Sequence, residues 1–184
     1  MALNVRLLES SFAKVKPQQI AFSASFYQKL FAHHPELKPL FKNADAKAQE
    51  RKLIISLAII VENLHNPQAL SAALKSLGAY HREIGTLREH YPFVGQALIE
   101  TFAEYLGKEW TSEIQQTWLD AYNLICETML EGAKNPNVYL GGELTFYEWL
   151  DLYGESSSRV REAIADTTHF KYRHSRAARE LLGN

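Results

Sequence analysis

The stretch that decides the fold covers residues 70–81 and reads Leu70-Ser-Ala-Ala-Leu-Lys-Ser-Leu-Gly-Ala-Tyr-His81. Its apolar residues recur at intervals of three and four, the spacing that places side chains on one face of an α-helix. The residues on this face are Leu70, Ala73, Leu74, Leu77, His81 and Ile84. The stretch therefore predicts an amphipathic helix whose apolar face ends in an imidazole directed into the interior of the protein.

Two interpretations of His81 are open from this spacing. The first is a core histidine that is satisfied by a hydrogen bond, which is the usual situation of a histidine on an apolar face. The second is a metal ligand, because imidazole is the side chain most often offered to haem iron. The rest of the chain is needed to choose between them.

Composition narrows the class of protein. The chain has 184 residues, of which 46% are hydrophobic, so we expect one domain with a sizeable core. Its 20 basic and 21 acidic residues form no block of like charge, which argues against a nucleic-acid partner. Cys126 is the single cysteine, so no internal disulfide framework exists and a reducing compartment is favoured.

The same survey gives no sign of export or membrane insertion. The N-terminus has no basic stretch leading into an apolar run, and the longest apolar run, residues 57–61, is too short to cross a bilayer. We therefore expect a cytoplasmic protein with no membrane partner. The apolar neighbours of Cys126 predict a buried thiol that packs as a small hydrophobe and does not act as a nucleophile.

Helical periodicity recurs throughout residues 1–132, and no segment shows sustained strand alternation. Asp45 and Asn66 have the residue types of helix N-caps, and Ser112 with Gln115 has the pattern of a capping box. Proline or glycine marks several helix boundaries. The expected helices cover residues 4–15, 18–33, 36–41, about 46–64, 67–84, 92–106 and 112–132. The sequence thus predicts an all-α core of about seven or eight helices with short joints.

Residues 133–184 differ in character and are treated as a C-terminal extension. The segment begins with chain breakers at Asn135-Pro-Asn and Gly141-Gly142, and it is rich in tyrosine, phenylalanine and tryptophan. Such aromatic density argues against a disordered tail. We expect a partly helical segment, with helices near residues 157–164 and 173–182, that packs on the core, on a partner or on a second copy in a homodimer.

Three motifs in order give residues 1–132 a family resemblance. The first two are Phe26-Tyr27-Gln-Lys-Leu-Phe31 and His34-Pro35-Glu36-Leu37-Lys-Pro-Leu-Phe41. The third is Tyr80-His81 followed by Tyr91-Pro-Phe-Val-Gly95. Together they resemble the haem globins, and within them the bacterial single-domain and flavohaemoglobin-type globins. The resemblance implies a three-over-three globin fold that binds haem b.

By this resemblance, His81 is the proximal ligand of the haem iron. An imidazole on an apolar helix holds the iron on one side and leaves the opposite coordination position open. Its second ring nitrogen is expected to donate to the carbonyl of Leu77, one turn earlier. The resemblance also implies a haem pocket formed by Phe41, Leu53, Leu77, Ile84, Tyr91 and Val94.

On the opposite, distal side the resemblance implies Tyr27 and Gln49. Both side chains carry hydrogen-bond donors, which would stabilise negative charge on bound dioxygen. Gln49 is chosen because it precedes His81 by the 32 residues expected of this branch (81 − 49 = 32). Two alternatives stay open for this position, namely a register in which Ala46 replaces Gln49 and a glutamine that lies on an exposed helix surface.

The chain also departs from the flavohaemoglobin pattern. The glutamate that bonds the proximal histidine in that branch aligns with Ala133, and Glu131 lies two positions away on another face. The sequence shows no glycine-rich dinucleotide loop, so oxidation of nitric oxide or reactive oxygen species requires a separate reductase. The first function we expect is a globin that binds dioxygen or nitric oxide, with enzymatic activity left open.

Two alternative functions are also open. In one, residues 133–184 transmit the ligand state to a partner, as in a gas sensor. In the other, the fold holds a linear tetrapyrrole (a bilin such as biliverdin) in place of haem, with Cys126 as the one thiol available for attachment.

Overall fold

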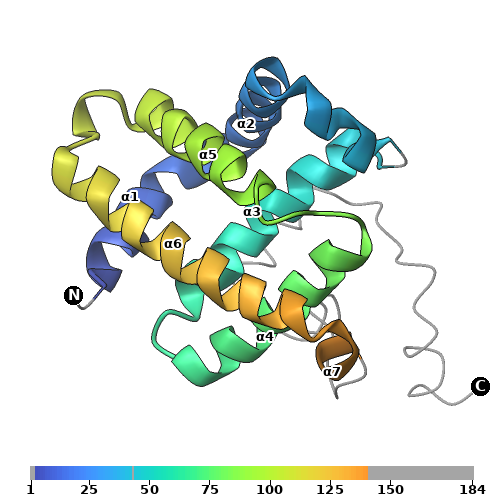
Figure 1. Cartoon of the computed structure of the whole chain (residues 1–184). Helices are drawn as coiled ribbons and strands as arrows, with labels where there is room; N and C mark the ends of the chain where they lie inside the picture. The colour runs from blue at the N-terminus through green and yellow to red at the C-terminus, as the bar shows by residue number, and fades with distance from the viewer. Residues whose placement is uncertain (1–2, 43, 141–184) are drawn as a thin grey trace, which may run out of the picture.

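A computed structural model describes residues 3–42 and 44–140, and over these residues the chain is helical without any strand (Figure 1). The α-helices are α1 (Val5–Val15), α2 (Gln19–His33), α3 (Ala46–Glu62), α4 (Pro67–Glu83), α5 (His90–Leu106), α6 (Ser112–Lys134) and α7 (Pro136–Leu140). Three short 3-10 helices join them: η1 (Lys16–Gln18), η2 (Pro35–Phe41) and η3 (Gly107–Glu109). The all-α prediction is confirmed, with seven α-helices in the described part of the chain.

Side-chain caps explain where most of these helices begin. The Asp45 carboxylate accepts a hydrogen bond from the Ala48 amide at 2.7 Å, and the Asn66 side chain accepts from the Ala69 amide at 3.3 Å. Each bond satisfies one of the amides that a helix start leaves without a partner. Both predicted caps are therefore confirmed.

Two predicted boundaries are wrong by one or two residues. Thr111, and not Ser112, caps α6, because Thr111 has extended backbone angles and its hydroxyl accepts from the Ile114 amide at 3.2 Å. Helix α5 begins at His90, two residues before Pro92. Pro92 is tolerated there because the first turn of a helix needs no amide donor.

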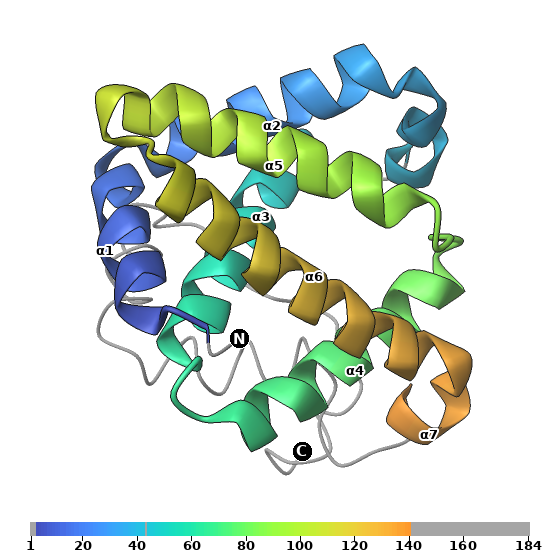
Figure 2. The same cartoon turned by 60° about the vertical axis from the view of Figure 1, so that its left-hand side comes forward.

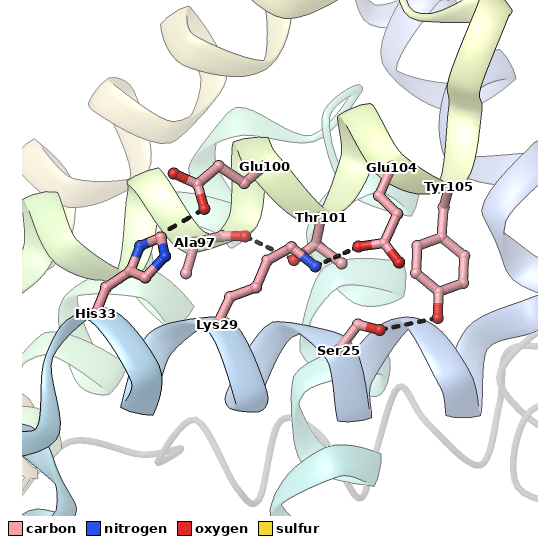
Figure 3. A network of polar contacts seen from close by, with 8 residues as sticks. All are labelled: Ser25, Lys29, His33, Ala97, Glu100, Thr101, Glu104 and Tyr105. Atoms are coloured by element: carbon pink, nitrogen blue, oxygen red, sulfur yellow. Dashed lines mark hydrogen bonds and ion pairs between the residues drawn. The ribbon is translucent and has the colours of Figure 1, made fainter.

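The helices form two layers of three, with α2, α5 and α6 on one side and α1, α3 and α4 on the other (Figure 2). Helix α2 packs on α5 within the first layer, and α4 packs on α6 across the layers. At the outer edge of α2 and α5, a row of polar contacts joins the two helices (Figure 3). These contacts are Ser25 with Tyr105, Lys29 with Glu104, and His33 with Glu100.

The core consists of two apolar clusters. The larger one lies among α1, α2, α3, α5 and α6, where the ring of Phe102 stacks on Trp118 with centroids 4.0 Å apart. In the smaller one, apolar residues of α4 pack against Ile59 and Ile60 near the end of α3, against Tyr91 of α5 and against Met129 of α6. Between them lies the cavity described below.

Glycine allows α4 and α6 to approach each other closely. A Cβ atom on Gly78 would lie 1.8 Å from the carbonyl oxygen of Met129, and one on Gly132 would lie 2.0 Å from the carbonyl oxygen of Lys75. Any larger residue at either position would require the backbone to move. These two glycines thus determine how closely α4, which carries His81, packs against α6.

The described structure covers only the start of the predicted extension. Helix α6 continues to Lys134, and α7 follows and packs mainly against α4. The helices predicted near residues 157–164 and 173–182 lie outside the described residues. The domain boundary at residue 132 stays a prediction.

Candidate functional site

All nine predicted site residues line one cavity of about 270 Å³ between the two apolar clusters. They come from α2, η2, α3, α4, α5 and the α4–α5 connection. These residues are Tyr27, Phe41, Gln49, Leu53, Leu77, His81, Ile84, Tyr91 and Val94. The structure therefore brings together positions that lie as far apart as residues 27 and 94 in the sequence.

His81 enters this cavity from the last turn of α4 as a neutral imidazole. Its Nδ1 lies 2.9 Å from the carbonyl oxygen of Leu77, and because a carbonyl only accepts, Nδ1 must carry the hydrogen. Burial lowers the pKa of His81 below its usual value and outweighs the bond to Leu77, which raises it. The ring is thus neutral at pH 7 with a lone pair on Nε2, and the predicted bond to Leu77 is confirmed.

Tyr27 reaches the cavity from α2 with its proton firmly held. Its hydroxyl donates to the backbone carbonyl of Gln49 at 3.3 Å, and its ring meets that of Phe41 edge-on with centroids 5.8 Å apart. Burial raises the pKa of Tyr27 well above its usual value, and the nearby Glu50 raises it further. At neutral pH Tyr27 is therefore a hydrogen-bond donor and not a phenolate.

Gln49 lies in the first turn of α3 and lines the cavity, whereas the alternative Ala46 is exposed and lies outside the lining. The bond from Tyr27 to the Gln49 carbonyl fixes this turn against α2. The geometry thus favours Gln49 over Ala46, and it also argues against an exposed surface glutamine.

Ile84 lies at the open edge of the cavity, where 43% of it is exposed. It is the C-cap residue of α4 and precedes Gly85, whose φ of 91° allows the chain to leave the helix. Lys52 and His90 line the same cavity. A mainly apolar lining with a few polar and charged side chains suits a flat ligand that is apolar in the middle and charged at the rim.

Tyr91, Tyr122 and Cys126 line the same cavity as His81 and form a cluster that no sequence pattern predicted. The hydroxyl of Tyr122 donates to the backbone carbonyl of Tyr91 at 2.6 Å. Burial raises the pKa of Tyr91 to about 12 and that of the Cys126 thiol to about 11. All three groups are protonated at neutral pH, which agrees with the predicted unreactive thiol.

Gly95 is the residue that makes room for this cluster. A Cβ atom at Gly95 would lie 2.5 Å from Cε1 of the Tyr122 ring. The glycine of the Tyr91-Pro-Phe-Val-Gly95 motif therefore has a packing reason, because it lets Tyr122 cross α5 and reach the Tyr91 carbonyl. No local pattern in the sequence connects Gly95 with Tyr122, so the cluster is visible only in the structure.

No carboxylate acts on the His81 ring among the described residues, since burial and the Leu77 carbonyl account for its shifted pKa. Glu131 is engaged elsewhere, in an ion pair of 2.9 Å with Lys75. Ala133 has no carboxylate to bond His81, and Glu131 does not take over this role because it pairs with Lys75. The hydrogen bond that orients His81 runs to a neutral acceptor.

The described part of the chain lacks two other kinds of feature. It contains no group of three or more histidine, cysteine, aspartate or glutamate side chains that could hold a metal ion. It also contains no helix that is long and apolar enough to cross a bilayer.

The family model for globins matches residues 24–129, which is more than half of the chain. This chain is a member of the globin family. The matched residues run from α2 to the last turns of α6 and include all nine predicted site residues. The predicted resemblance and fold are confirmed.

The relatives and solved structures that resemble this globin include bacterial proteins. A flavohemoprotein of Chromobacterium violaceum is 28% identical over 131 residues, which are 70% of this chain and 32% of that protein. A flavohemoprotein of Rhizobium meliloti is 35% identical over 106 residues, which are 56% of this chain and 26% of that protein. The globin thus spans about a third of the length of these relatives.

Two solved structures have the same fold. One is a protein from Rhodothermus marinus that is described both as an engineered carbene transferase and as a nitric oxide dioxygenase. It has 27% sequence identity to this chain and a TM-score of 0.65. The match covers 75% of this chain and 96% of that one. A bacterial globin from Campylobacter jejuni has 20% identity and a TM-score of 0.62 over 71% of this chain and 94% of its own, and this similarity concerns the fold alone.

Proposed function

We propose that this globin binds haem through His81 and binds dioxygen or nitric oxide at the open side of the haem. The observation that carries the proposal is the state of the His81 ring. It is neutral, buried in an apolar cavity, and held by Leu77 so that the Nε2 lone pair is the one available for coordination. A metal requires such a deprotonated nitrogen, and haem iron is commonly held by one.

The cavity fits haem in its chemistry. Its lining includes the apolar side chains of Leu53, Leu77 and Val94 and the polar side chains of Lys52 and His90. A porphyrin is apolar over its faces and carries two carboxylates at one rim, so this distribution suits it. When bound through His81, haem would supply an iron that can bind a diatomic gas. We assign haem b because the proposal requires no covalent bond to the protein.

The chain's own residues then decide how a polar gas ligand is held. Tyr27 keeps its proton at neutral pH and directs its hydroxyl to the side of the cavity formed by α3. Gln49 adds an amide donor in the same wall. Hydrogen bonds to a group with negative charge contribute about 1.5–3 kcal/mol each, or roughly tenfold to a hundredfold in ligand affinity.

We further propose that the globin acts as an enzyme that oxidises nitric oxide. It is supported by the similarity to flavohemoproteins and to the Rhodothermus marinus protein. The cycle needs electrons, and we propose a separate reductase as their source. Since the ring of His81 is oriented by a neutral carbonyl and no carboxylate, we expect slower turnover than in globins that have such a carboxylate.

A gas-sensing function is the second candidate, and the contact between α7 and α4 favours it. Helix α7 follows the region matched by the family model and packs on the helix that carries His81. Any movement of α4 on ligand binding would therefore reach the start of the extension directly. Unaltered ligand kinetics and assembly after deletion of residues 133–184 would rule out this candidate.

The proposal is tested by comparing three absorption spectra, those of the wild type, His81→Ala and His65→Ala. His65 is the matched control because it is an exposed histidine that bonds Glu9, outside the cavity. We expect a Soret band in the wild type and in His65→Ala, and loss of haem or a changed band in His81→Ala. An unaltered haem spectrum in His81→Ala contradicts the proposal. A broad long-wavelength band in the purified wild type would instead identify a bilin.

A further inference from the structure

Cys126 lines the cavity in which we place the haem, as His81 does. It comes from α6, and His81 comes from α4, the helix that packs closely on α6. Cys126 packs with Ile125 and Leu130 against the smaller apolar cluster. It is also the single cysteine of the chain, so any chemistry of a thiol in this cavity belongs to this residue.

The register of α4 on α6 places Cys126 opposite the proposed iron ligand. Gly78 lies against the backbone carbonyl of Met129. One turn earlier on α4, the carbonyl of Lys75 lies against Gly132, which is one turn later on α6. The two helices are therefore antiparallel at this contact. One turn in the other direction, the same register pairs Cys126 with the iron ligand, and from there both side chains line the cavity.

The His81 ring is independent evidence that a ligand occupies this cavity. The ring is buried and neutral, and its Nδ1 hydrogen is bonded to Leu77. None of the described residues bonds Nε2, and a buried polar atom without a partner is costly. A group held by Nε2 thus enters the cavity that Cys126 lines.

The Cys126 thiol suits an addition to a vinyl group, and haem b carries vinyl groups on its rim. In this addition sulfur bonds the vinyl carbon next to the ring, and the thiol hydrogen moves to the terminal carbon. No atom leaves, and neither an oxidant nor a reductant is consumed. Burial raises the pKa of Cys126 to about 11, and the hydrogen bond with Tyr122 lowers it in part. The thiol therefore keeps the hydrogen that the addition transfers.

We propose that Cys126 is a site of covalent haem attachment, where its thiol adds to a vinyl group of the bound haem and forms a thioether. This inference rests on the haem binding proposed above, in which haem b enters first and is held by His81. Until haem enters, the thiol stays free. A thiol fixed beside its partner reacts at a high effective concentration, even where it is inert toward reagents in solution. The thioether keeps haem in the protein when the bond between His81 and the iron opens.

Mass spectrometry of the acid-denatured protein tests the attachment. The wild type is loaded with haem b, kept reduced under nitrogen, and then denatured in acid, which releases haem that is held only through its iron. We expect the wild-type chain to gain the mass of a complete haem, and the modified proteolytic peptide to contain Cys126. A wild type that shows a Soret band but releases all its haem in acid overturns the proposal.

Mesohaem, in which ethyl groups replace the vinyl groups, is the matched control for the haem. We expect the wild type to bind mesohaem and to release all of it in acid. Mesohaem that stays attached to the chain overturns the proposal, because the vinyl group would then be unnecessary. This comparison uses one and the same chain, so it does not depend on the folding of any variant.

Two variants provide the matched control for the thiol. In Cys126→Ala, we expect acid to release every haem that binds, and covalent haem in this variant overturns the assignment of Cys126. Adding Leu124→Cys to Cys126→Ala moves the thiol to a position that is 53% exposed and outside the cavity lining, so we again expect complete release. Failure of the proposed function looks different, because the wild type would then show no Soret band with either haem, and both proposals would fall.

Discussion

At the scale of single residues, the site depends on groups that burial keeps neutral. His81 loses its proton more easily than usual, whereas Tyr27, Tyr91 and Cys126 hold theirs more firmly. In each case the cause is the cost of placing a charge in an apolar cavity. The result at pH 7 is a cavity lined by one uncharged acceptor nitrogen and by uncharged donors.

Replacing Tyr27 by phenylalanine tests the proposed donor. Tyr27→Phe removes the hydroxyl and preserves the ring contact with Phe41. We expect dioxygen to dissociate roughly tenfold to a hundredfold faster in a stopped-flow measurement, since a hydrogen bond to a charged acceptor contributes about 1.5–3 kcal/mol. Tyr105→Phe is the control, because Tyr105 bonds Ser25 at the edge of α2 and α5 (Figure 3). Equal dissociation rates in Tyr27→Phe and the wild type would refute a role for the hydroxyl.

The raised pKa of Cys126 predicts a strong pH dependence of its alkylation. With a pKa of about 11, the thiolate fraction is about one in a thousand at pH 8 and rises nearly tenfold per pH unit up to pH 10. We expect the rate of modification by iodoacetamide, followed by mass spectrometry, to rise in the same proportion. The chain unfolded in guanidinium is the control, and its rate should level off near the usual thiol pKa of about 8.5. A native rate that levels off at the same pH would contradict the burial of this thiol.

At the scale of helices, the sequence predicted a helix start correctly where only one residue at the boundary could act as the cap. Asp45 and Asn66 were identified as caps because each is followed directly by a helical pattern. Thr111 and Ser112 are adjacent hydroxyl residues, and either one suits a cap, so local pattern alone could not choose between them. In the structure Thr111 is the cap, because its backbone is extended and its hydroxyl accepts from the Ile114 amide.

The contact between α4 and α6 makes Gly78 a sensitive position. An exposed helix interior favours alanine over glycine by about 1 kcal/mol, so propensity alone predicts that Gly78→Ala stabilises the protein. The contact with the Met129 carbonyl predicts the opposite. We expect a net loss of about 1–3 kcal/mol in the free energy of unfolding, measured with urea, because the two backbones must separate.

The control for this prediction is Ser71→Ala, a substitution on the same helix that creates no close approach. We expect its free energy of unfolding to stay within about 0.5 kcal/mol of the wild type, as for most substitutions away from tight contacts. Gly78→Ala that is as stable as the wild type, or more stable, would show that α4 does not need this approach to α6.

At the scale of the whole molecule, the cavity between the two apolar clusters is the feature that the sequence predicted least completely. The residues around it were found because His81, Tyr27 and the Tyr91 motif have recognisable spacings. Leu8 and Trp118 were not assigned to any site, because an apolar residue that lines a cavity has the same pattern as one that packs in the core. Only the three-dimensional arrangement distinguishes the two.

The central claim is that Nε2 of His81 holds the iron of a bound haem. It is tested most directly by resonance Raman spectroscopy of ferrous, ligand-free His81→Gly with and without imidazole in the buffer. We predict an iron–imidazole stretching band in the wild type, its loss in His81→Gly, and its return when imidazole fills the space that the side chain has left. A band that persists in His81→Gly without added imidazole would contradict the account, because another residue would then hold the iron.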